Sequence, residues 1–599
     1  MRARGPRLRR LLTLGPPIVA LALLVAGVPA AAAGTTPGTA TLAGSRPEIV
    51  YGGAVRFTGQ VSSDPACEGG RPVQLQGREP GQTAWTTLRS KTTATDGTFS
   101  FSRRPLHSSS YRAVLPLYVT ADASCAHVRS PTVANTVHAR VVLTLTTDPL
   151  FAGNCSALTV TVSPPKLPTP VALEQLRPSG WRTLFSGSLD SQSTASGSVC
   201  YGWSALGTVS LRATWPAPDA LNAAGTSHSV ALHVVKAPWM VRIDRLTSGR
   251  SISVAVASGP TMLYERADGV AHAPASNEKL LQSMALLDRL GPTYQIKTRA
   301  AATSTGKTIG GALWILGRGD PSVGRRAIAA LATRIVAAGV RRVGRVMGAK
   351  GYFSRDWWAP GWRSFFQAEE VALPTALTYQ GNQVRGVHVR DPERRAAAAL
   401  ARALERRGVK VVGKPGQGTP PGGLHRVAEV ESAPLQRLLR RQNLVSNNFS
   451  AEVLGKLLGV KRYGKPGTIA KGAAALRAFA AAHGVEATAN DSSGLSYRDR
   501  LSAIGIVRLL RTAESSSWGR ALRSTLPAPG QGTLEERLHG VPVRAKTGTL
   551  HDISALSGWV KLARTGRWAR FSILSSGFDV FRAKDIEDGI VRNLWRYGH

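Results

Sequence analysis

Cysteine is scarce in this chain and confined to its first third. Of 599 residues only four are cysteines, and residues 201–599 contain none. Acidic residues are also few. The chain has 36 Asp and Glu and 76 Lys and Arg, which gives a formal net charge of +40. No apolar run after residue 33 is long enough to cross a bilayer. The composition therefore excludes an acidic disordered chain, a collagen and a multi-span membrane protein. The length predicts three or more domains.

The N-terminus has the pattern of an export signal. Residues 1–10 contain five arginines and no acid, and an apolar run follows over 11–33, ending in small residues. This pattern predicts a signal peptide at 1–33, cleaved within 31–34. The run is also long enough to remain as an N-terminal membrane anchor, and the sequence leaves cleavage or retention open. No cysteine lies near the cleavage site, which excludes a lipid anchor there. We expect a secreted or extracytoplasmic protein, in a compartment where disulfides form.

Residues 42–236 contain an internal repeat of about 100 residues. Pro-Val-Gln-Leu at 72–75 corresponds to Pro-Val-Ala-Leu at 170–173, and Trp-Thr-Thr-Leu at 85–88 corresponds to Trp-Arg-Thr-Leu at 181–184. Each repeat is rich in Thr, Val and Ser, in short alternating runs separated by Gly, Pro and Asp. Short strands at this spacing predict two immunoglobulin-like sandwiches, at 42–140 and 141–236.

Each repeat holds two of the four cysteines. We therefore predict the pairs Cys67–Cys125 and Cys155–Cys200, one of the three pairings that four cysteines allow. The cysteines do not align between the repeats, so the two bridges are expected to join different strands.

From about residue 237 the character of the chain changes. Ala- and Arg-rich helical stretches appear, such as 393–407, followed by a strand at 409–412. Alternating helices and strands predict an α/β or α+β domain over 237–599. This part carries 55 of the basic residues and 26 of the acidic ones.

One short motif in this part pairs a serine with a lysine. Ser276 and Lys279 precede apolar residues at helical spacing, which places the lysine amine beside the serine hydroxyl one turn away. A serine hydroxyl needs a base to become a nucleophile, and a lysine with a lowered pKa can serve. The same Ser-x-x-Lys pattern occurs at 163–166, where prolines interrupt it, and at 304–307 in a turn-like stretch.

Two further motifs follow at separations of 170 and 100 residues. Ser446-Asn447-Asn448 lies in a bend between a helix at 435–441 and the next apolar helix. Lys546-Thr547-Gly548-Thr549 lies on a predicted strand, followed by a hairpin at 555–563 and 568–576. On such a strand Lys546 and Gly548 share a face, and the small glycine is expected to let substrate backbone lie close.

The order SxxK, SxN, KTG resembles the serine D-alanyl-D-alanine carboxypeptidases and endopeptidases, the low-molecular-mass penicillin-binding proteins with a domain inserted between SxxK and SxN. The resemblance covers roughly 240–599 and extends to strings at 317–322, 351–353, 360–362 and 491–496, which are expected to be scaffold and groove walls. It implies a serine β-lactamase/transpeptidase-like α/β (α+β) domain with an inserted subdomain at about 300–430. The interval between SxxK and SxN looks shorter than is usual for the type.

The resemblance also implies roles for the motif residues. Ser276 would be the nucleophile, Lys279 its base, and Ser446 a proton relay to the leaving amine. Asn448 would hold the substrate amide, and Lys546 would supply positive charge. Thr547, Gly548 and Thr549 would bind the substrate carboxylate end, with backbone N–H groups of Ser276 and Thr549 as oxyanion hole. The substrate would be a peptidoglycan peptide ending in D-Ala-D-Ala, and β-lactams would acylate Ser276.

Two alternatives stay open from the sequence. One is a β-lactamase or esterase of the same fold, although no Glu-x-x-Leu-Asn string for a deacylating water lies between Lys279 and Lys546. The other is a non-catalytic wall-binding protein.

No metal or cofactor is expected, because no HExxH pattern is present. Export argues against nucleic acid, and anionic cell-wall polymers are the expected counter-charge for a wall-associated protein. The sequence does not distinguish carboxypeptidase activity from endopeptidase activity.

Overall fold

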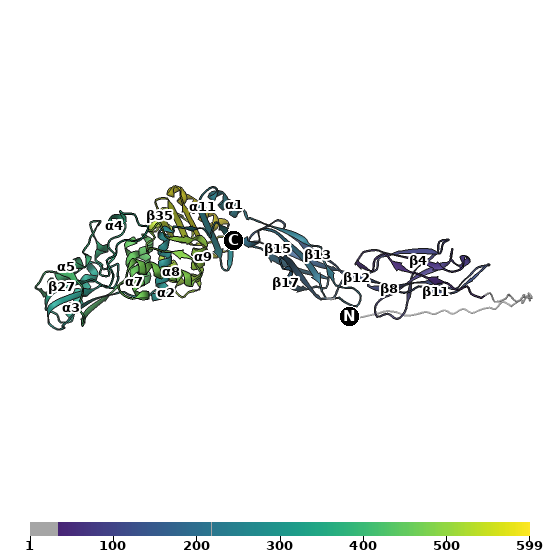
Figure 1. The fold of residues 1–599 in the computed structure, drawn as a ribbon, viewed down its shortest axis with the longest axis horizontal. Helices are drawn as coiled ribbons and strands as arrows, with labels where there is room; N and C mark the ends of the chain where they lie inside the picture. Colours follow the sequence, from purple (N-terminus) through teal and green to yellow (C-terminus); the bar gives the residue numbers. More distant parts are fainter. Residues whose placement is uncertain (1–33, 217) are drawn as a thin grey trace, which may run out of the picture. The chain divides into compact units, whose positions relative to one another are not determined.

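The computed structural model describes residues 34–216 and 218–599 (Figure 1). The predicted signal peptide at 1–33 lies outside the described residues. None of the helices in the described ranges is both long and apolar enough to cross a membrane. Contacts divide the chain into two compact units, the second of which contains 231–599 and two short segments of the second repeat, 145–158 and 198–210.

The internal repeat in the sequence is a repeat of strand arrangement. In the first repeat β8 (Ser109–Leu115), β5 (Pro72–Arg78) and β6 (Thr86–Thr92) lie side by side, and β3 (Glu48–Val50) pairs in parallel with β12 (Val133–His138). In the second repeat β19 (Gly207–Trp215), β16 (Pro170–Arg177) and β17 (Gly180–Ser188) follow the same order, and β14 (Leu150–Phe151) pairs in parallel with β21 (Val230–Val235). Buried side chains alternate with partly buried ones along β5 and with partly buried or exposed ones along β16, as expected for strands with one face on a core.

The cysteine pairing predicted from the sequence is confirmed. Cys67 in the short helix η1 (Pro65–Cys67) is bonded to Cys125 in β10 (Ser124–Cys125), with a Cα–Cα distance of 5.6 Å. Cys155 in β15 (Cys155–Ser163) is bonded to Cys200 in β18 (Thr194–Cys200), with a Cα–Cα distance of 4.0 Å. The bridges join non-equivalent elements of the two repeats, as their misalignment in the sequence predicted.

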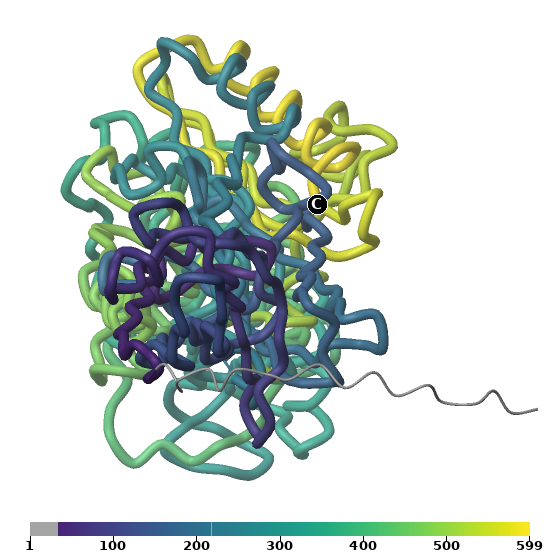
Figure 2. Tube along the Cα trace, turned by 90° about the vertical axis from the view of Figure 1, so that its right-hand side faces the viewer, coloured from purple at the N-terminus to yellow at the C-terminus, as the bar shows by residue number. Residues whose placement is uncertain are grey.

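A five-stranded antiparallel sheet organises the C-terminal part. Its order is β23 (Thr261–Arg266), β22 (Ile252–Ser258), β37 (Trp568–Ser576), β36 (Ile553–Lys561) and β35 (Val543–Leu550). Eight consecutive residues of β36 are buried, which requires cover on both faces of the sheet. Part of that cover is α11 (Val580–Tyr597), which lies beside α1 (Pro238–Thr247) although 333 residues separate them (Figure 2). The Asn593 side chain donates to the Trp239 carbonyl at 2.7 Å and joins the two helices.

Helix α2 (Glu278–Leu290) is the centre of the helical part. It contacts α6 (Leu435–Leu444), α7 (Asn448–Tyr463), α8 (Ile469–Ala482), α9 (Ala503–Ser515) and α10 (Gly519–Thr525). Residues 278–287 are buried around the whole circumference of α2. The helical spacing of the apolar residues after Lys279 predicts a buried stripe on one side of α2, whereas Lys279 itself is also fully buried. The reason is that α7 covers the face that the pattern left open.

Residues 297–431 build a second sheet with a core of its own. Its order is β30 (Lys410–Val411), β27 (Arg342–Ala349), β26 (Thr308–Leu316), β25 (Lys297–Ala302) and β32 (His425–Glu431). Helices α3 (Arg325–Ala337) and α5 (Pro392–Glu405) pack against each other and enclose this core with the sheet. The helix predicted at 393–407 is α5, which begins at a proline in its first turn. The strand predicted at 409–412 is shorter, because only two residues pair with β27.

Candidate active site

The three sequence motifs meet at one cleft. Its volume is about 520 Å³, and its walls include Ser276, Ser446, Asn448, Thr547 and Thr549. The first motif spans the short helix η3 (Ala275–Asn277) and the start of α2, the second lies between α6 and α7, and the third lies on β35. Residues separated by 170 and 100 positions are thus brought to one surface.

Ser276 lies on a tightly held turn at the start of α2. It belongs to the short helix η3 (Ala275–Asn277), which runs directly into α2. The preceding residue, Ala275, has a φ of +47°, and Gly494 packs so closely that a β-carbon there would lie 1.8 Å from the Ala275 carbonyl oxygen. The Asn277 side chain donates to the Ser557 hydroxyl of β36 at 3.0 Å. These contacts hold the Ser276 hydroxyl at the edge of the sheet.

The Lys279 amine donates to three acceptors, and its side chain is fully buried. They are the Ser276 hydroxyl at 2.9 Å, the Asn448 side-chain oxygen at 2.7 Å and the Ser493 carbonyl at 2.6 Å. Burial lowers the pKa of Lys279 from its ordinary value to about 8, and the carboxylates of Asp491 and Glu452 oppose this shift. Lys279 can therefore lose its proton close to neutral pH.

Ser446 and Lys546 form the second hydroxyl–amine pair. The Lys546 amine donates to the Ser446 hydroxyl at 2.9 Å and to the Thr547 carbonyl at 2.7 Å. Ser446 has a φ of +55°, a left-handed conformation that costs a non-glycine residue energy and points its hydroxyl at Lys546. Burial, and secondly the charge of Lys279, lower the pKa of Lys546 well below its ordinary value.

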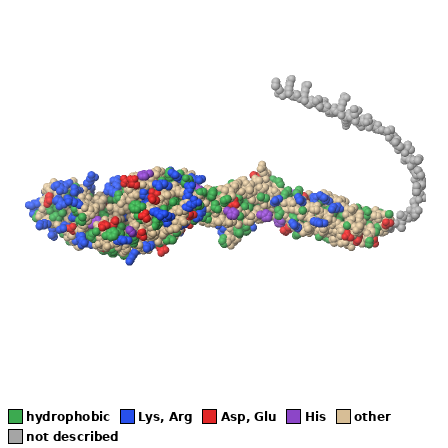
Figure 3. Space-filling model, turned by 90° about the horizontal axis from the view of Figure 1, so that it is seen from above, with side chains coloured by type: hydrophobic (Ala, Val, Ile, Leu, Met, Phe, Trp, Pro, Cys, Tyr) green, Lys and Arg blue, Asp and Glu red, His purple; other side chains and the backbone are tan. Residues whose placement is uncertain are grey.

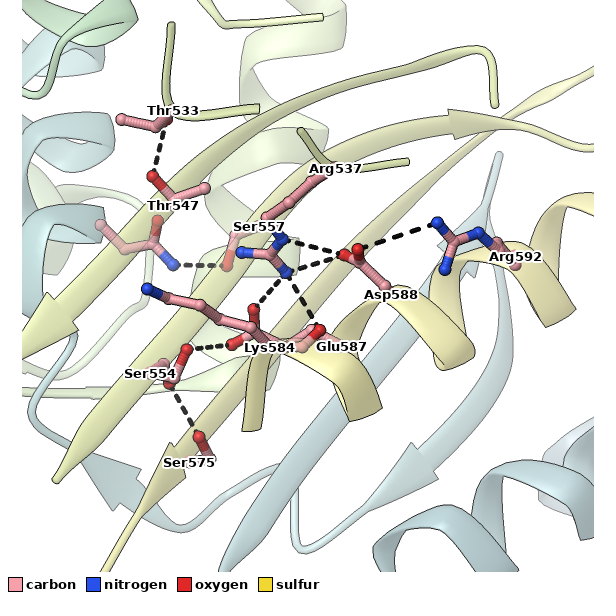
Figure 4. Close-up of polar contacts among 11 residues, drawn as sticks. Thr533, Arg537, Thr547, Ser554, Ser557, Ser575, Lys584, Glu587, Asp588 and Arg592 are labelled. Carbon is pink, nitrogen blue, oxygen red and sulfur yellow. Dashed lines mark hydrogen bonds and ion pairs between the residues drawn. The ribbon is translucent and has the colours of Figure 1, made fainter. Parts of the chain in front are cut away.

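Strand β35 carries the third motif along the edge of the sheet. The Thr547 hydroxyl donates to the Thr533 hydroxyl at 2.8 Å, and Figure 4 shows the two side chains pointing at one another. Gly548 does not lie open to a substrate as the sequence predicted. A β-carbon on Gly548 would come within 2.7 Å of the Pro274 carbonyl and 3.1 Å of the Ala275 side chain. The glycine therefore lets β35 approach the turn that holds Ser276.

A buried ionic network supports the sheet at β36 and α11. The Ser554 hydroxyl of β36 donates to Glu587 at 2.7 Å, and Glu587 and Asp588 both accept from Arg537 at 2.8 Å (Figure 4). A buried carboxylate is tolerated when it is paired and hydrogen-bonded in this way. The network ties β36, which pairs with the third motif, to the C-terminal helix.

Asp491 organises the wall behind Lys279. One carboxylate oxygen of Asp491 accepts the backbone N–H groups of Ser493 and Gly494 at 3.1 and 2.7 Å. The other oxygen accepts from Ser496 N–H at 2.9 Å and from the Trp362 indole at 2.6 Å. The strings at 360–362 and 491–496 are thus one structure, as their predicted scaffold role requires. This structure directs the Ser493 carbonyl at the Lys279 amine.

Sequence reasoning missed Glu370. Its carboxylate accepts from the Asn448 side-chain nitrogen at 2.9 Å and lines the cleft. Glu370 precedes Asn448 by 78 residues in a stretch without a recognisable motif, so no pattern could have pointed to it. Because Asn448 also accepts from Lys279, Glu370 fixes which way the amide is turned.

No metal site is evident in the described ranges. Nowhere in 34–216 or 218–599 do three or more His, Cys, Asp or Glu side chains gather in an arrangement that could hold a metal ion.

Comparison with known proteins decides the family. Residues 241–385 and 365–597 match the profile of the D-Ala-D-Ala carboxypeptidase 3 (S13) family. The chain belongs to this family. The S13 match spans the five-stranded sheet, the helical part and the 297–431 sheet, and it confirms the resemblance predicted from the three motifs.

Two carboxypeptidases are similar to part of this chain. A D-alanyl-D-alanine carboxypeptidase of Actinomadura sp. (strain R39) is 28% identical over 430 residues, 56% of this chain and 79% of its own length. A carboxypeptidase of Mycobacterium tuberculosis is 30% identical over 368 residues, 56% of this chain and 78% of its own length. Penicillin binding protein 4 from Haemophilus influenzae has the same fold, with a TM-score of 0.53 at 19% identity over 59% of this chain and 99% of its own.

Proposed function

We propose that the protein is a serine D-Ala-D-Ala carboxypeptidase acting on peptidoglycan stem peptides, with Ser276 as its nucleophile. The observation that carries this proposal is the pair of bonds from the buried Lys279 amine to Ser276 and Asn448 inside the cleft. The Lys279 amine, whose pKa is lowered, contacts a serine hydroxyl that lines the cleft. Membership of the S13 family supports the same reaction.

Acylation begins at Ser276. The neutral Lys279 amine takes the hydroxyl proton while the serine oxygen attacks the carbonyl between the two D-alanines. Backbone N–H groups of Ser276 and Thr549, both on the cleft wall, are proposed to hold the developing oxyanion. Asn448 has its oxygen on Lys279 and its nitrogen on Glu370, and it is proposed to orient the substrate amide.

Departure of D-alanine requires a proton on its nitrogen. Ser446 is proposed to deliver it and to regain a proton from Lys279, which leaves Lys279 neutral again. The Ser446 hydroxyl lines the cleft with Ser276 and accepts from Lys546. Burial lowers the pKa of Lys546, and a substrate carboxylate beside it would stabilise its charged form. Thr547 and Thr549 would complete the carboxylate site. Water then attacks the acyl-Ser276 ester, while the neutral Lys279 amine takes a proton from the water and passes it to the departing Ser276 oxygen.

A β-lactam would acylate Ser276 by the same route. The penicilloyl ester is expected to persist, because the sequence lacks the glutamate that class A β-lactamases use to activate water. Fast turnover of nitrocefin would instead favour the β-lactamase alternative.

The remaining organisation is proposed from the sequence. The two repeats at 42–140 and 141–236 are proposed to be immunoglobulin-like domains, in front of a catalytic domain at 237–599 with an inserted subdomain at about 300–430. The predicted signal at 1–33 supports a secreted or wall-associated location. The net charge of +40 supports anionic wall polymers as partners.

The test pairs labelling with product release. Ser276→Ala is expected to lose labelling by fluorescent penicillin and to lose D-Ala release from a pentapeptide. Ser304→Ala is the matched control, because Ser304 begins an identical Ser-x-x-Lys pattern and is exposed outside the cleft. Labelling of Ser276→Ala at the wild-type level would overturn the mechanism. A wild-type protein that labels but releases no D-Ala would overturn the carboxypeptidase assignment.

A further inference from the structure

A second hollow, about 480 Å³ in volume, lies between α3 and α5. Four arginines line it, one at the start of α3 and three along α5, together with one tyrosine, and no carboxylate is among its lining residues. These side chains, called the arginine groove here, are Arg325, Arg395, Arg402, Arg406 and Tyr379. None of them belongs to the three catalytic motifs.

The charges of the arginine groove are not neutralised by the protein. Within the described ranges, the guanidinium groups of Arg325, Arg402 and Arg406 make no ion pair with a carboxylate, although other arginines of this region do. Arg395 donates to the Gln383 carbonyl at 3.2 Å and lies over the Tyr379 ring, so it too lacks an anionic partner. Unpaired like charges facing one hollow repel each other, and a bound anion would relieve that repulsion.

The surrounding structure strengthens the positive potential. Helix α3 begins with Arg325 and Arg326 and has no acid in its first turn, so the positive end of its dipole is not compensated. Residues 300–430 contain 21 Lys and Arg against 8 Asp and Glu. Figure 3 shows Lys and Arg side chains gathered over the region of α3 and α5, at its far left.

The dimensions of the arginine groove suit a chain of anions. Its arginines recur along α5 from 395 to 406, a rise of about 16 Å at 1.5 Å per residue. Between them Ala398, Ala399 and Ala403 form a low floor, which leaves the groove open along its length. One phosphate would engage one or two guanidinium groups, whereas successive phosphates could engage all of them. Guanidinium groups bind phosphate oxygens in a bidentate manner.

We propose that the arginine groove binds a phosphodiester-linked cell-wall polymer, such as a polyol phosphate. The proposal rests on the proposed function, because that function places the protein at the wall. It deepens the function by giving a polymer site separate from the peptide cleft. Nucleic acid carries the same phosphates, but its single strands need several aromatic rings for base stacking, and Tyr379 is the groove's single aromatic side chain.

The experiment is a titration of the full chain with fluorescently labelled poly(glycerol phosphate), followed by anisotropy at several salt concentrations. Arg325→Gln combined with Arg402→Gln removes two unpaired charges from the arginine groove. The matched control combines Lys307→Gln with Arg345→Gln, which removes two exposed charges of the same sheet region outside the groove. The groove variant is expected to bind at least about tenfold more weakly, because one charged hydrogen bond commonly contributes about that much. The control is expected to bind as the wild type does.

Three results would overturn the proposal. They are an equal loss in both double variants, tighter binding of single-stranded DNA than of the polymer, and competition by inorganic phosphate at the same concentration of phosphate groups. D-Ala release from a soluble pentapeptide, measured on the same samples, is expected to stay unchanged in both variants. Loss of polymer binding with normal D-Ala release in the groove variant would support the arginine groove as the polymer site. Absence of D-Ala release in the wild type would overturn the proposed function and leave the result on the groove unaffected.

Discussion

Two buried lysines define the chemistry of the cleft. Lys279 and Lys546 are both fully buried, and each donates to a serine hydroxyl at 2.9 Å. Removing an ammonium group from water disfavours its charge, so burial lowers the pKa of both amines. A lysine with a pKa near neutrality is a usable general base, whereas a solvated lysine is not.

The first prediction concerns the pH dependence of acylation. As the proposed base, Lys279 can accept the serine proton only when it is neutral, so the acylation rate constant for a fluorescent penicillin should rise with pH and reach half its plateau near the pKa of about 8. At pH 7 the rate should be about tenfold below the plateau. Stopped-flow labelling from pH 6 to 9.5 measures this, and Lys279→Arg should stay unlabelled throughout. A flat profile would contradict the assignment of Lys279 as the base.

At the scale of elements, the joint between α6 and α7 positions the second motif. Helix α6 ends at Leu444 and α7 begins at Asn448, with the Asn447 side chain accepting the Ser450 N–H at 2.7 Å as an N-cap. Ser446 is left between them in a left-handed conformation. Backbone strain at a functional residue is retained when the surrounding elements determine the geometry.

The second prediction separates stability from activity at this joint. Ser446→Gly should be more stable than Ser446→Ala by about 0.5–1 kcal/mol, because glycine adopts the left-handed conformation without a steric cost. Both variants should lose most of their D-Ala release, since neither carries the hydroxyl that contacts Lys546. Thermal unfolding and product release on the same samples measure this. If the alanine variant were the more stable one, the strain at Ser446 would not be real.

The third prediction concerns the loop at 491–496. Asp491→Asn replaces one of two accepting oxygens with an NH₂ group that faces donors, so unfolding should become easier by about 2–4 kcal/mol. The Asp491 carboxylate also raises the pKa of Lys279, so its removal should lower that pKa and move the acylation profile to lower pH.

Asp499→Asn is the control for the Asp491 variant. Burial raises the pKa of Asp499 well above its ordinary value. The charges that raise the pKa of Lys279 are those of Asp491, Glu452, Glu370 and Glu278, so Asp499 does not contribute to that shift. The control should be destabilised without a shift of the pH profile. Equal shifts in both variants would show that the effect comes from loosening of the loop instead of from the charge.

At the scale of the whole molecule, covalent and non-covalent stabilisation are distributed unequally. Both disulfides lie in the two β-rich repeats, and the described residues 237–599 contain no cysteine. The C-terminal part relies instead on extensive buried clusters around α2 and on the buried network at Arg537.

The fourth prediction uses this distribution. Removal of the Cys67–Cys125 bridge, which closes a loop of 58 residues, should destabilise the first repeat by about 4 kcal/mol. Cys67→Ser combined with Cys125→Ser removes this bridge and leaves Cys155–Cys200, which lies in the same compact unit as 231–599, intact. Calorimetry should show the transition of the first repeat moving to lower temperature, while the transition of the unit that contains 231–599 stays in place. D-Ala release should be the same in the variant and the wild type. Loss of activity in the variant would contradict independent unfolding of the two units.

The sequence by itself determined the elements that depend on local order along the chain. The three motifs, the repeat, the cysteine pairing and the hairpin after the third motif are visible because turns, periodicities and spacings are properties of neighbouring residues. The structure confirms the cysteine pairing and the hairpin. In that hairpin β37 has the predicted bounds, whereas β36 begins and ends two residues earlier than the predicted 555–563.

Only the tertiary structure decided how those pieces act together. Lys279 is buried because α7 and the 491–496 loop cover it. Gly548 lies against the carbonyl of Pro274, a residue distant in the sequence. Glu370 accepts a hydrogen bond from Asn448, which lies 78 residues further along the chain. The arginine groove exists because α3 and α5 pack side by side. Long-range packing sets burial, dielectric and contact, and these quantities decide whether a serine and a lysine at the right spacing have the pKa and geometry that the proposed nucleophile and base require.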